Sequence, residues 1–275
     1  MSDEQSTDQS GTQTPGSIDD LPAHSDRPAS LRMQALQTTV LNVDPEELTG
    51  TLVVLEGPDG SGRTTQIKLL TEWLEWKGFA VQTMGLRRSY LLAEDIDEVL
   101  AQNVVRPLTL ALLYATDFYD QLENRILPAL RAGLVVLADR FIFTLLARAA
   151  ARGIDRSYLD NLYDLVVEPD LNFRLSVSPQ TSFERIFQES QTISFWEAGA
   201  DLNLADNLYD SFVGYQQMLR DQFDELSATW PFRQIDGEAS VRQVNERLRA
   251  QIGTHLGIED TSYQPSEELV HLWRL

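Results

Sequence analysis

A glycine-rich segment, LEGPDGSGRTTQ at residues 55–66, constrains the fold of this chain more than any other feature. It follows an apolar run that is typical of a buried strand, and it precedes a segment with apolar residues at helical spacing. Its spacing matches the phosphate-binding pattern G-x-x-x-x-G-K-[ST], except that Arg63 stands where the pattern has lysine. A strand, a glycine turn and a helix in this order predict a loop whose backbone N–H groups bind phosphate.

The predicted phosphate-binding residues are those of the loop and of the first helical turn after it. They are Gly57, Asp59, Gly60, Ser61, Gly62, Arg63, Thr64 and Thr65. The hydroxyl of Thr64 is also a predicted ligand of a magnesium ion. Arginine preserves the charge of lysine but is larger and planar, so Arg63 could hold two phosphate oxygens or could displace the phosphates or the metal. The sequence leaves both possibilities open.

Strand-like and helix-like segments alternate through the rest of the chain. The expected strands are 51–57, 79–84, 134–140, 170–179 and 232–237. The expected helices are 64–78, 90–102, 106–133, 141–152, 157–167, 180–190, 207–226 and 240–253. This alternation predicts an α/β fold, in which an open, mostly parallel five-stranded sheet is covered by helices on both faces.

Composition sets two flanking segments apart from a domain at 49–256. Residues 1–48 carry nine acidic and two basic side chains among many small polar residues, which predicts a disordered acidic tail. Within this tail, residues 30–41 could form a short helix. Residues 257–275 are assigned to a C-terminal extension that could pack against the domain.

The composition argues against several classes of protein and site. The net charge is −20, so the basic surface of a nucleic-acid-binding protein is missing. The chain has no cysteine, which excludes disulfides and thiolate metal sites, and it has only three scattered histidines. No apolar run approaches the roughly 18 residues that span a bilayer, and no secretory signal is recognisable. We therefore expect a cytoplasmic protein that binds neither nucleic acid nor a membrane.

A second chemical motif, VVLADRF at 135–141, ends the third expected strand. A carboxylate directly after a buried strand is the second magnesium-organising position in enzymes with a phosphate-binding loop of this kind. Asp139 is therefore a predicted metal ligand, and Arg140 beside it is a candidate to bind a substrate phosphate. The alternatives are a helix N-cap for Asp139 and a surface ion pair for Arg140.

Five motifs occur in the order and spacing of the thymidylate kinase family, which the chain resembles over about residues 51–252. They are the loop, the Asp-Arg pair, ILPALRAGLVVLADR, RGID and PDLNFRLSVSP. The resemblance implies a P-loop NTPase-type fold and transfer of the ATP γ-phosphoryl group to a nucleoside monophosphate, formally dTMP, with Mg²⁺ as cofactor. It implies a catalytic role for Arg63, Asp139 and Arg140, of which Arg140 would bind the acceptor phosphate. It also makes a homodimer possible.

Several positions depart from the family pattern. After the second strand, TMGLRRS replaces Arg-Glu-Pro, so Arg87 or Arg88 could supply the missing cation. Leu113 and Asp117 align with an aromatic residue that stacks on the base and an arginine that contacts it, and Ala147-Arg148-Ala149 replaces a base-reading Ala-Tyr-Gln. The predicted acceptor-binding set is Asp59, Arg87, Arg88, Leu113, Asp117, Arg140 and Thr144. Changes at such positions leave the identity of the acceptor open.

The segment after the fourth strand, residues 186–212, has no arginine or lysine. Family members without an arginine in the phosphate loop usually bring arginines from this lid. We therefore hypothesise that Arg63 takes over part of the missing charge. Phe195 and Trp196 within the segment either contact the acceptor or fill core space.

Three functions fit these observations. The first is an active nucleoside monophosphate kinase. The second is a nucleotide-binding regulatory or interaction protein on the same fold, with weak or no turnover. The third is a P-loop kinase for another phosphorylated acceptor. Phosphoryl transfer to a panel of acceptors discriminates among them, whereas ATP binding does not.

Overall fold

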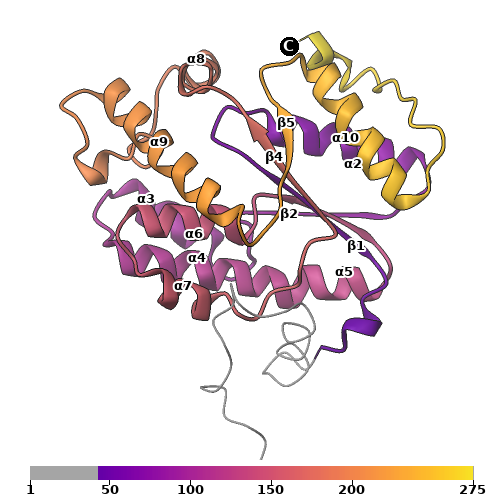
Figure 1. The fold of residues 1–275 in the computed structure, drawn as a ribbon, viewed down its shortest axis with the longest axis horizontal. Helices are drawn as coiled ribbons and strands as arrows, with labels where there is room; N and C mark the ends of the chain where they lie inside the picture. Colours follow the sequence, from indigo (N-terminus) through magenta and orange to yellow (C-terminus); the bar gives the residue numbers. More distant parts are fainter. Residues whose placement is uncertain (1–42, 275) are drawn as a thin grey trace, which may run out of the picture.

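A five-stranded parallel sheet forms the centre of the structure, a computed structural model that describes residues 43–274 (Figure 1). The strand order is β2-β3-β1-β4-β5. The strands are β1 (Thr51–Glu56), β2 (Val81–Gly85), β3 (Val135–Asp139), β4 (Leu171–Ser176) and β5 (Arg233–Asp236). The predicted α/β fold is confirmed, whereas residues 1–42, which hold most of the predicted tail and its short helix, lie outside the described residues.

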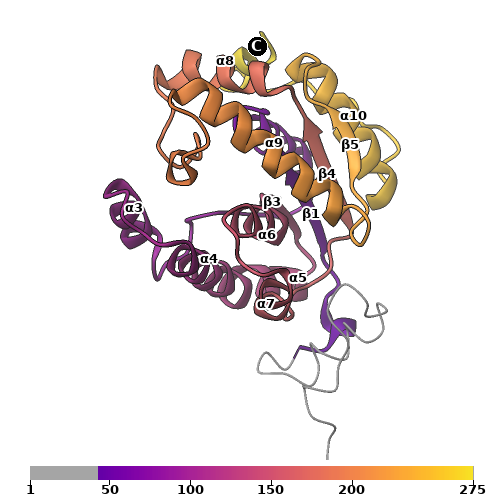
Figure 2. The ribbon, with the colours of Figure 1, turned by 60° about the vertical axis from the view of Figure 1, so that its left-hand side comes forward.

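Helices cover both faces of this sheet (Figure 2). They are α2 (Arg63–Trp76), α3 (Ala93–Ala101), α4 (Pro107–Gln121), α5 (Leu127–Arg131), α6 (Ile142–Ala151), α7 (Arg156–Leu162), α8 (Pro179–Ser190), α9 (Leu208–Leu226) and α10 (Val241–Leu256). Short 3₁₀ turns lie at η3 (Pro45–Glu47), η5 (Ala200–Leu202) and η6 (Val270–Arg274). No helix in the described range 43–274 is both long and apolar enough to cross a membrane.

Alternating side chains of the strands divide the core into two layers. Those on one face pack against α2 and α10, and those on the other face pack against α4 to α7 and part of α9. In β1, for example, Val53 and Leu55 belong to the first layer, and Leu52 and Val54 belong to the second. The strand is buried on both sides, as expected for the centre of a parallel sheet.

The predicted helix at 106–133 contains a π-helical turn at Leu122–Ile126, which joins α4 to α5. Pro128 lies just after this turn. Proline has no N–H group, and its ring clashes with the carbonyl four residues earlier in a regular α-helix. A widened turn is one way in which a helix continues past such a residue.

The predicted helix at 157–167 is wrong in its second half. Helix α7 begins after the N-cap Asp155 and ends at Leu162. The residues beyond it include Val166 and Val167, which are non-helical and buried in the core layer. Two successive β-branched residues with a proline shortly after them favour an extended chain over a helix.

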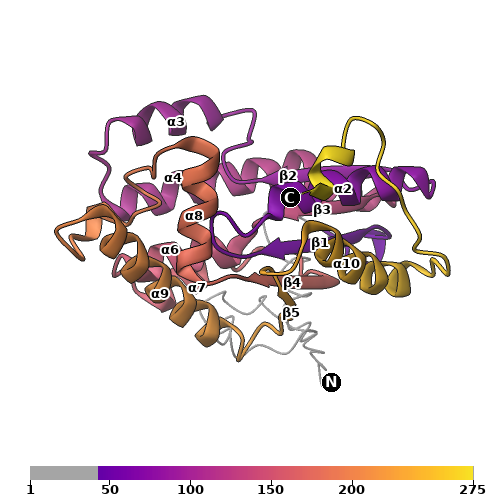
Figure 3. The ribbon, with the colours of Figure 1, turned by 90° about the horizontal axis from the view of Figure 1, so that it is seen from above.

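The carboxyl ends of the central strands meet at one edge of the sheet, which Figure 3 shows from above. Leu55 of β1 and Gly85 of β2 both pair with Asp139 at the end of β3. This register brings the glycine-rich loop, the turn after β2 and the Asp-Arg pair together. In open α/β sheets, ligands bind at this edge.

The residues that follow α10 fold back beside α2 and α10 (Figure 3). Leu269, Leu272 and Trp273 pack against the apolar layer of these helices. Tyr263 is buried, and its hydroxyl donates a hydrogen bond to Glu72 of α2. The division of the chain at residue 257 stays a prediction, but the described part of this segment is packed against the sheet domain.

We expect Tyr263→Ala to lower the free energy of unfolding by roughly 3 kcal/mol, because a buried ring leaves a cavity and Glu72 loses its donor. Chemical denaturation followed by circular dichroism measures this change. The control is Tyr158→Ala, since the side chain of Tyr158 is 41% exposed. Equal stabilities of the two variants would show that the C-terminal segment does not contribute to the core.

Candidate active site

The glycine-rich loop is pressed closely against β4 and α8. A Cβ atom on Gly57 would lie 2.7 Å from the carbonyl oxygen of Leu175, and one on Gly60 would lie 2.7 Å from that of Ser182. Both glycines also have positive φ angles, +152° and +72°. Larger residues would therefore displace the loop. Helix α2 begins directly after it, so the backbone N–H groups of the first turn have no intrahelical acceptors.

The side chain of Arg63 lies inside this loop and is buried. Its Nη1 donates hydrogen bonds to the carbonyl oxygens of Gly57 and Pro58, and to Oγ of Ser61 at 3.1 Å. Its Nε donates to Oδ1 of Asp139 at 3.0 Å. The guanidinium group thus occupies the concave side of the loop. A phosphate group that enters the loop has to replace these hydrogen bonds.

Asp139 and Thr64, the two predicted magnesium ligands, are in direct contact. The Thr64 hydroxyl donates to Oδ2 of Asp139 at 2.7 Å. Burial alone would raise the pKa of Asp139, but the charge of Arg63 and the hydrogen bond from Thr64 outweigh it and hold the pKa below its usual range. Asp139 is therefore an anion at neutral pH, as a metal ligand must be.

Asp59 is shared by three arginines. Arg140 pairs with its Oδ1, Arg148 lies 3.1 Å from Oδ2, and Nη2 of Arg63 lies 3.9 Å from Oδ1. Burial would raise the pKa of Asp59, but the charges of Arg140, Arg148 and Arg63 exceed that effect and lower it strongly. One carboxylate therefore balances a cluster that carries an excess of positive charge.

The backbone of Arg140 adopts a positive φ of +74°, which is unfavourable for a residue with a side chain. Glu56 stabilises the turn that follows it. The carboxylate of Glu56 is fully buried and accepts hydrogen bonds from the backbone N–H groups of Phe141 and Thr144, at 2.9 and 3.2 Å. These contacts fix the start of α6 and aim the Arg140 side chain at the loop.

A cavity of about 550 Å³, the active cleft, opens beside this cluster. Several of the predicted site residues line it together. They are Asp59, Arg63, Thr64, Arg87, Arg88, Asp139 and Arg140. Arg88 also lies 3.8 Å from Asp139, so the turn after β2 does bring a cation to the carboxylate. The remaining loop residues, Gly57, Gly60, Ser61, Gly62 and Thr65, shape the loop without lining the cleft.

Three predicted acceptor residues do not line the active cleft. Asp117 is completely buried and accepts hydrogen bonds from the backbone N–H groups of Arg87 and Ser89, so it holds the turn after β2 in place. Leu113 packs against the core layer. Thr144 lies behind Arg140 and donates to Glu56. Tyr114, the next residue along α4, lines the cleft instead.

Arg148 lines the cleft and was missed as a site residue by the sequence reasoning. It lies on α6 at a spacing of four residues from both Thr144 and Arg152. Residues four apart share one face of a helix. A row of polar residues on this face, directly after the Asp-Arg pair, was the available signal.

The predicted lid is docked over the cleft through specific contacts. Trp196 lines the cleft, and its Nε1 donates to the carbonyl oxygen of Leu100 in α3 at 2.9 Å. Arg152 of α6 pairs with Asp201 at 2.7 and 3.0 Å and donates to Tyr215. Asp201 therefore anchors the lid to the domain, which accounts for one of its acidic side chains.

Comparison with known proteins agrees with this geometry. The family model for thymidylate kinase matches residues 55–247. The chain belongs to the thymidylate kinase family. A protein of Saccharolobus solfataricus named probable thymidylate kinase 2 is 32% identical over 208 residues, which cover 75% of this chain and 97% of that protein. A protein of Thermococcus kodakarensis named probable thymidylate kinase is 30% identical over 217 residues, which cover 75% of this chain and 99% of that protein.

A bacterial thymidylate kinase, from Brachyspira hyodysenteriae, is 31% identical over 165 residues, which cover 59% of this chain and 81% of that protein. The match of the family model begins just before the glycine-rich loop and ends within α10. It therefore includes every residue that lines the active cleft, together with the lid.

We expect Asp59→Asn to destabilise the protein by about 3 kcal/mol at pH 7, because it leaves the buried arginine cluster without its carboxylate. The folded-state pKa of Asp59 lies below its ordinary value of 3.8, so its stabilising effect is present above that pH and is lost as the pH falls further. The stability difference between the two proteins should therefore shrink below about pH 4. Thermal unfolding across pH measures this difference.

The matched control for this prediction is Asp221→Asn, since Asp221 is exposed on α9. Its stability should stay within about 0.5 kcal/mol of the wild type. A constant difference between wild type and Asp59→Asn down to pH 2 would contradict the charge argument.

Proposed function

We propose that this protein is a nucleoside monophosphate kinase that transfers the γ-phosphoryl group of ATP to dTMP, with ADP and dTDP as products. One observation carries the proposal. The Asp-Arg pair at the end of β3 contacts the phosphate-binding loop directly, through Asp139 to Arg63 and Thr64 and through Arg140 to Asp59. A donor site and an acceptor site in such contact suit a transfer that depends on positioning and charge.

The loop and the first turn of α2 form the donor side. Their backbone N–H groups and the positive end of the helix would bind the ATP phosphates. Arg63 supplies the cation of this side once its hydrogen bonds to the loop carbonyls are exchanged for phosphate oxygens. The guanidinium group can bind two such oxygens at once.

The oxygen atoms of Thr64 and Asp139 fit a magnesium ion. Mg²⁺ prefers oxygen ligands and is usually bound by one or two carboxylates together with substrate phosphates and water. The described residues contain no cluster of three or more His, Cys, Asp or Glu side chains that could hold a metal, which agrees with a site of this open kind. When bound, the ion would neutralise charge on the transferred phosphoryl group.

Arg140 forms the acceptor side, assisted by Arg148 and by Arg87 or Arg88. Burial, and then the charge of Arg63, lower the pKa of Arg140 to about 10, so it still carries its charge at neutral pH. It would hold the acceptor phosphate so that one of its oxygens attacks the γ-phosphorus of ATP. The new P–O bond forms as the bond to the β–γ bridging oxygen breaks, and ADP leaves.

Tyr114, Phe195 and Trp196 bring aromatic rings to the wall of the cleft. They provide apolar surface beside the acceptor arginines, where a base could stack. A cytoplasmic location and a homodimer stay predictions from the sequence.

The decisive experiment is a screen of dTMP, dUMP, dCMP, AMP and GMP at millimolar concentration, with ATP and Mg²⁺, in which ADP release is followed. We expect turnover with dTMP. We also expect Arg140→Met to lower kcat/KM by about a hundredfold, because it removes a buried cation at the acceptor phosphate.

ATP binding without a diphosphate product from any acceptor would contradict the proposal and favour a nucleotide-binding regulator. If the protein phosphorylates another acceptor but not dTMP, the proposed reaction class is correct and the proposed acceptor is wrong. Arg242→Gln on the exposed surface of α10 serves as the control and should keep wild-type activity.

Arg63→Lys tests whether the arginine compensates for the lid without basic residues. We expect kcat to fall about tenfold, equivalent to about 1.4 kcal/mol, because lysine cannot hold two phosphate oxygens in a planar pair. Steady-state kinetics with ATP as the varied substrate measures the change. A lysine variant as active as the wild type, or more active, would refute the compensation.

A further inference from the structure

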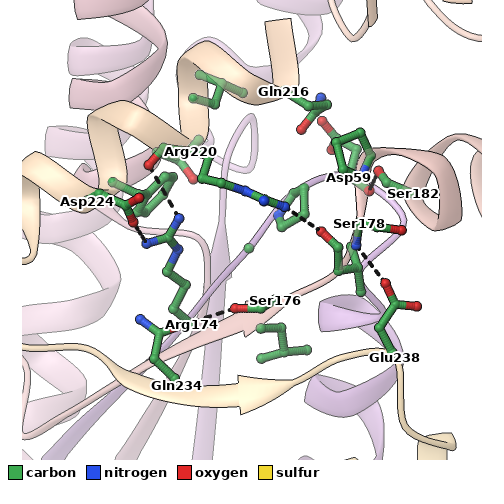
Figure 4. A pocket seen from close by; sticks show the side chains of 18 of the residues that line it. Asp59, Arg174, Ser176, Ser178, Ser182, Gln216, Arg220, Asp224, Gln234 and Glu238 are labelled. Atoms are coloured by element: carbon green, nitrogen blue, oxygen red, sulfur yellow. Dashed lines mark hydrogen bonds and ion pairs between the residues drawn. The ribbon is translucent and has the colours of Figure 1, made fainter. Parts of the chain in front are cut away.

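The face of β4 and β5 that points toward α9 is polar. On β4, Arg174 and Ser176 lie on this face, and Leu175 between them lies on the opposite, apolar face. On β5, Gln234 and Asp236 lie on this face, and Ile235 lies on the opposite one. Strands of a parallel sheet are normally covered by apolar side chains on both faces. Helix α9 instead packs on α6 and α8 and leaves a cavity of about 480 Å³ beneath it, the α9 pocket (Figure 4).

The α9 pocket and the active cleft lie on opposite sides of one wall. The wall consists of Asp59, Arg140 and Arg148, which line both cavities. Gly57 and Pro58 of the loop and Thr144 of α6 also line the α9 pocket; Gly57 is a predicted ATP residue and Thr144 a predicted acceptor residue, but neither lines the active cleft. The other lining residues come from β4, β5, α9, the start of α8 and the turns after β4 and β5, and none of these lines the active cleft.

Arg220 offers a cation at the outer side of the α9 pocket. It reaches from α9 toward the end of β4, where its Nη2 donates to the carbonyl oxygen of Val177 at 3.3 Å (Figure 4). Within residues 43–274 it has no carboxylate partner, unlike Arg174 nearby, which pairs with Asp224 at 2.6 Å. Arg220 is exposed, so its remaining donors face solvent and are available to a ligand at the mouth of the pocket.

The inner end of the α9 pocket holds two buried donors without acceptors among the described residues. They are Nε2 of Gln216, whose residue is 5% exposed, and Nε of Arg148. Figure 4 shows Gln216 on the same side of the pocket as Asp59. A buried donor without an acceptor costs about 1 to 3 kcal/mol. Two such donors at one cavity are available to an acceptor oxygen from solvent or from a ligand.

The surface between these two ends is largely apolar. Leu219 and Phe223 are four residues apart on α9 and face Val177 and Pro179 across the pocket. Pockets for small molecules commonly combine such a surface with a few polar groups that fix the orientation of the ligand.

We propose that the α9 pocket is a second ligand site, which binds a small organic oxyanion, either a phosphate monoester or a carboxylate. Arg220 binds one oxyanion group, and Nε2 of Gln216 and Nε of Arg148 donate hydrogen bonds to a second oxygen of the same molecule. Asp224, Asp236 and Glu238 also line the pocket. Because these carboxylates repel a highly charged ligand, a nucleoside triphosphate fits less well than a molecule with one or two charges.

Because Arg148 lines both cavities, a ligand in the α9 pocket would also affect the active cleft. A ligand oxygen on Nε of Arg148 would bind the same guanidinium group that pairs with Asp59 through Nη2. It would change the charge balance that Arg140 experiences on the other side of the wall. This consequence rests on the proposed function, whereas the binding site itself does not.

The test is isothermal titration of the full chain with three probes: dTMP, ribose 5-phosphate and malate. They represent a nucleotide, a phosphate monoester without a base, and a carboxylate. We expect at least one probe to bind with a Kd below about 1 mM, and Arg220→Gln to weaken that binding at least tenfold. For dTMP, the wild type should show a second binding event that Arg220→Gln removes.

Ser176→Leu is the second variant, since a leucine on β4 fills the α9 pocket without touching the active cleft. It should also abolish binding of the same probe. Arg242→Gln is the matched control and should bind the probe as the wild type does. Phosphoryl transfer to dTMP, measured without the other two probes, should stay within threefold of the wild type in all three variants, which separates this test from that of the proposed function.

Either of two results overturns the proposal. One is that none of the three probes binds to the wild type. The other is that the bound probe keeps its affinity in both Arg220→Gln and Ser176→Leu, which places it in the active cleft. The probe that binds most tightly identifies the class of ligand.

Discussion

The sharing of Asp59 by Arg140, Arg148 and Arg63 is the interaction on which the rest of the site depends. Three guanidinium groups lie within reach of one carboxylate, and the pKa of Arg140 is lowered by burial first and then by the charge of Arg63. The arrangement persists because rigid elements hold each member. Glu56 fixes the start of α6, the loop glycines fix Asp59, and burial keeps water from screening the charges. The cluster thus concentrates positive charge beside the glycine-rich loop, where the phosphates of the two substrates would meet.

Much of this fold could be predicted from the sequence because its signals are local. Alternating strands and helices specified the sheet, and the Asp-Arg pair after β3 predicted the residues that meet the loop. Features that depend on register or on tertiary packing were harder to predict from the sequence. On α4, Leu113 packs against the core layer and does not line the cleft, whereas its neighbour Tyr114 belongs to the core layer and also lines the cleft. The buried role of Asp117 and the inward direction of Arg63 depend on partners distant in the chain, which no local pattern specifies.

The lid and the loop together show how charge is distributed in a family member with few lysines. Asp201 does not face a phosphate, because it pairs with Arg152 and holds the lid to α6. The basic groups of the cleft come instead from the loop, the turn after β2 and α6. The cations are therefore carried by elements packed on the sheet. They need less ordering on substrate binding than cations on a mobile segment would.

The packing of Trp273 and Leu272 against α2 and α10 has a practical consequence for work with this protein. Helix α2 begins at the phosphate-binding loop, and Glu72 near its other end is bound by Tyr263 and Ser266. An affinity tag or fluorescent protein fused directly after Leu275 would begin three residues beyond Trp273, whose ring is packed against these helices. A fusion at this end therefore needs a flexible spacer.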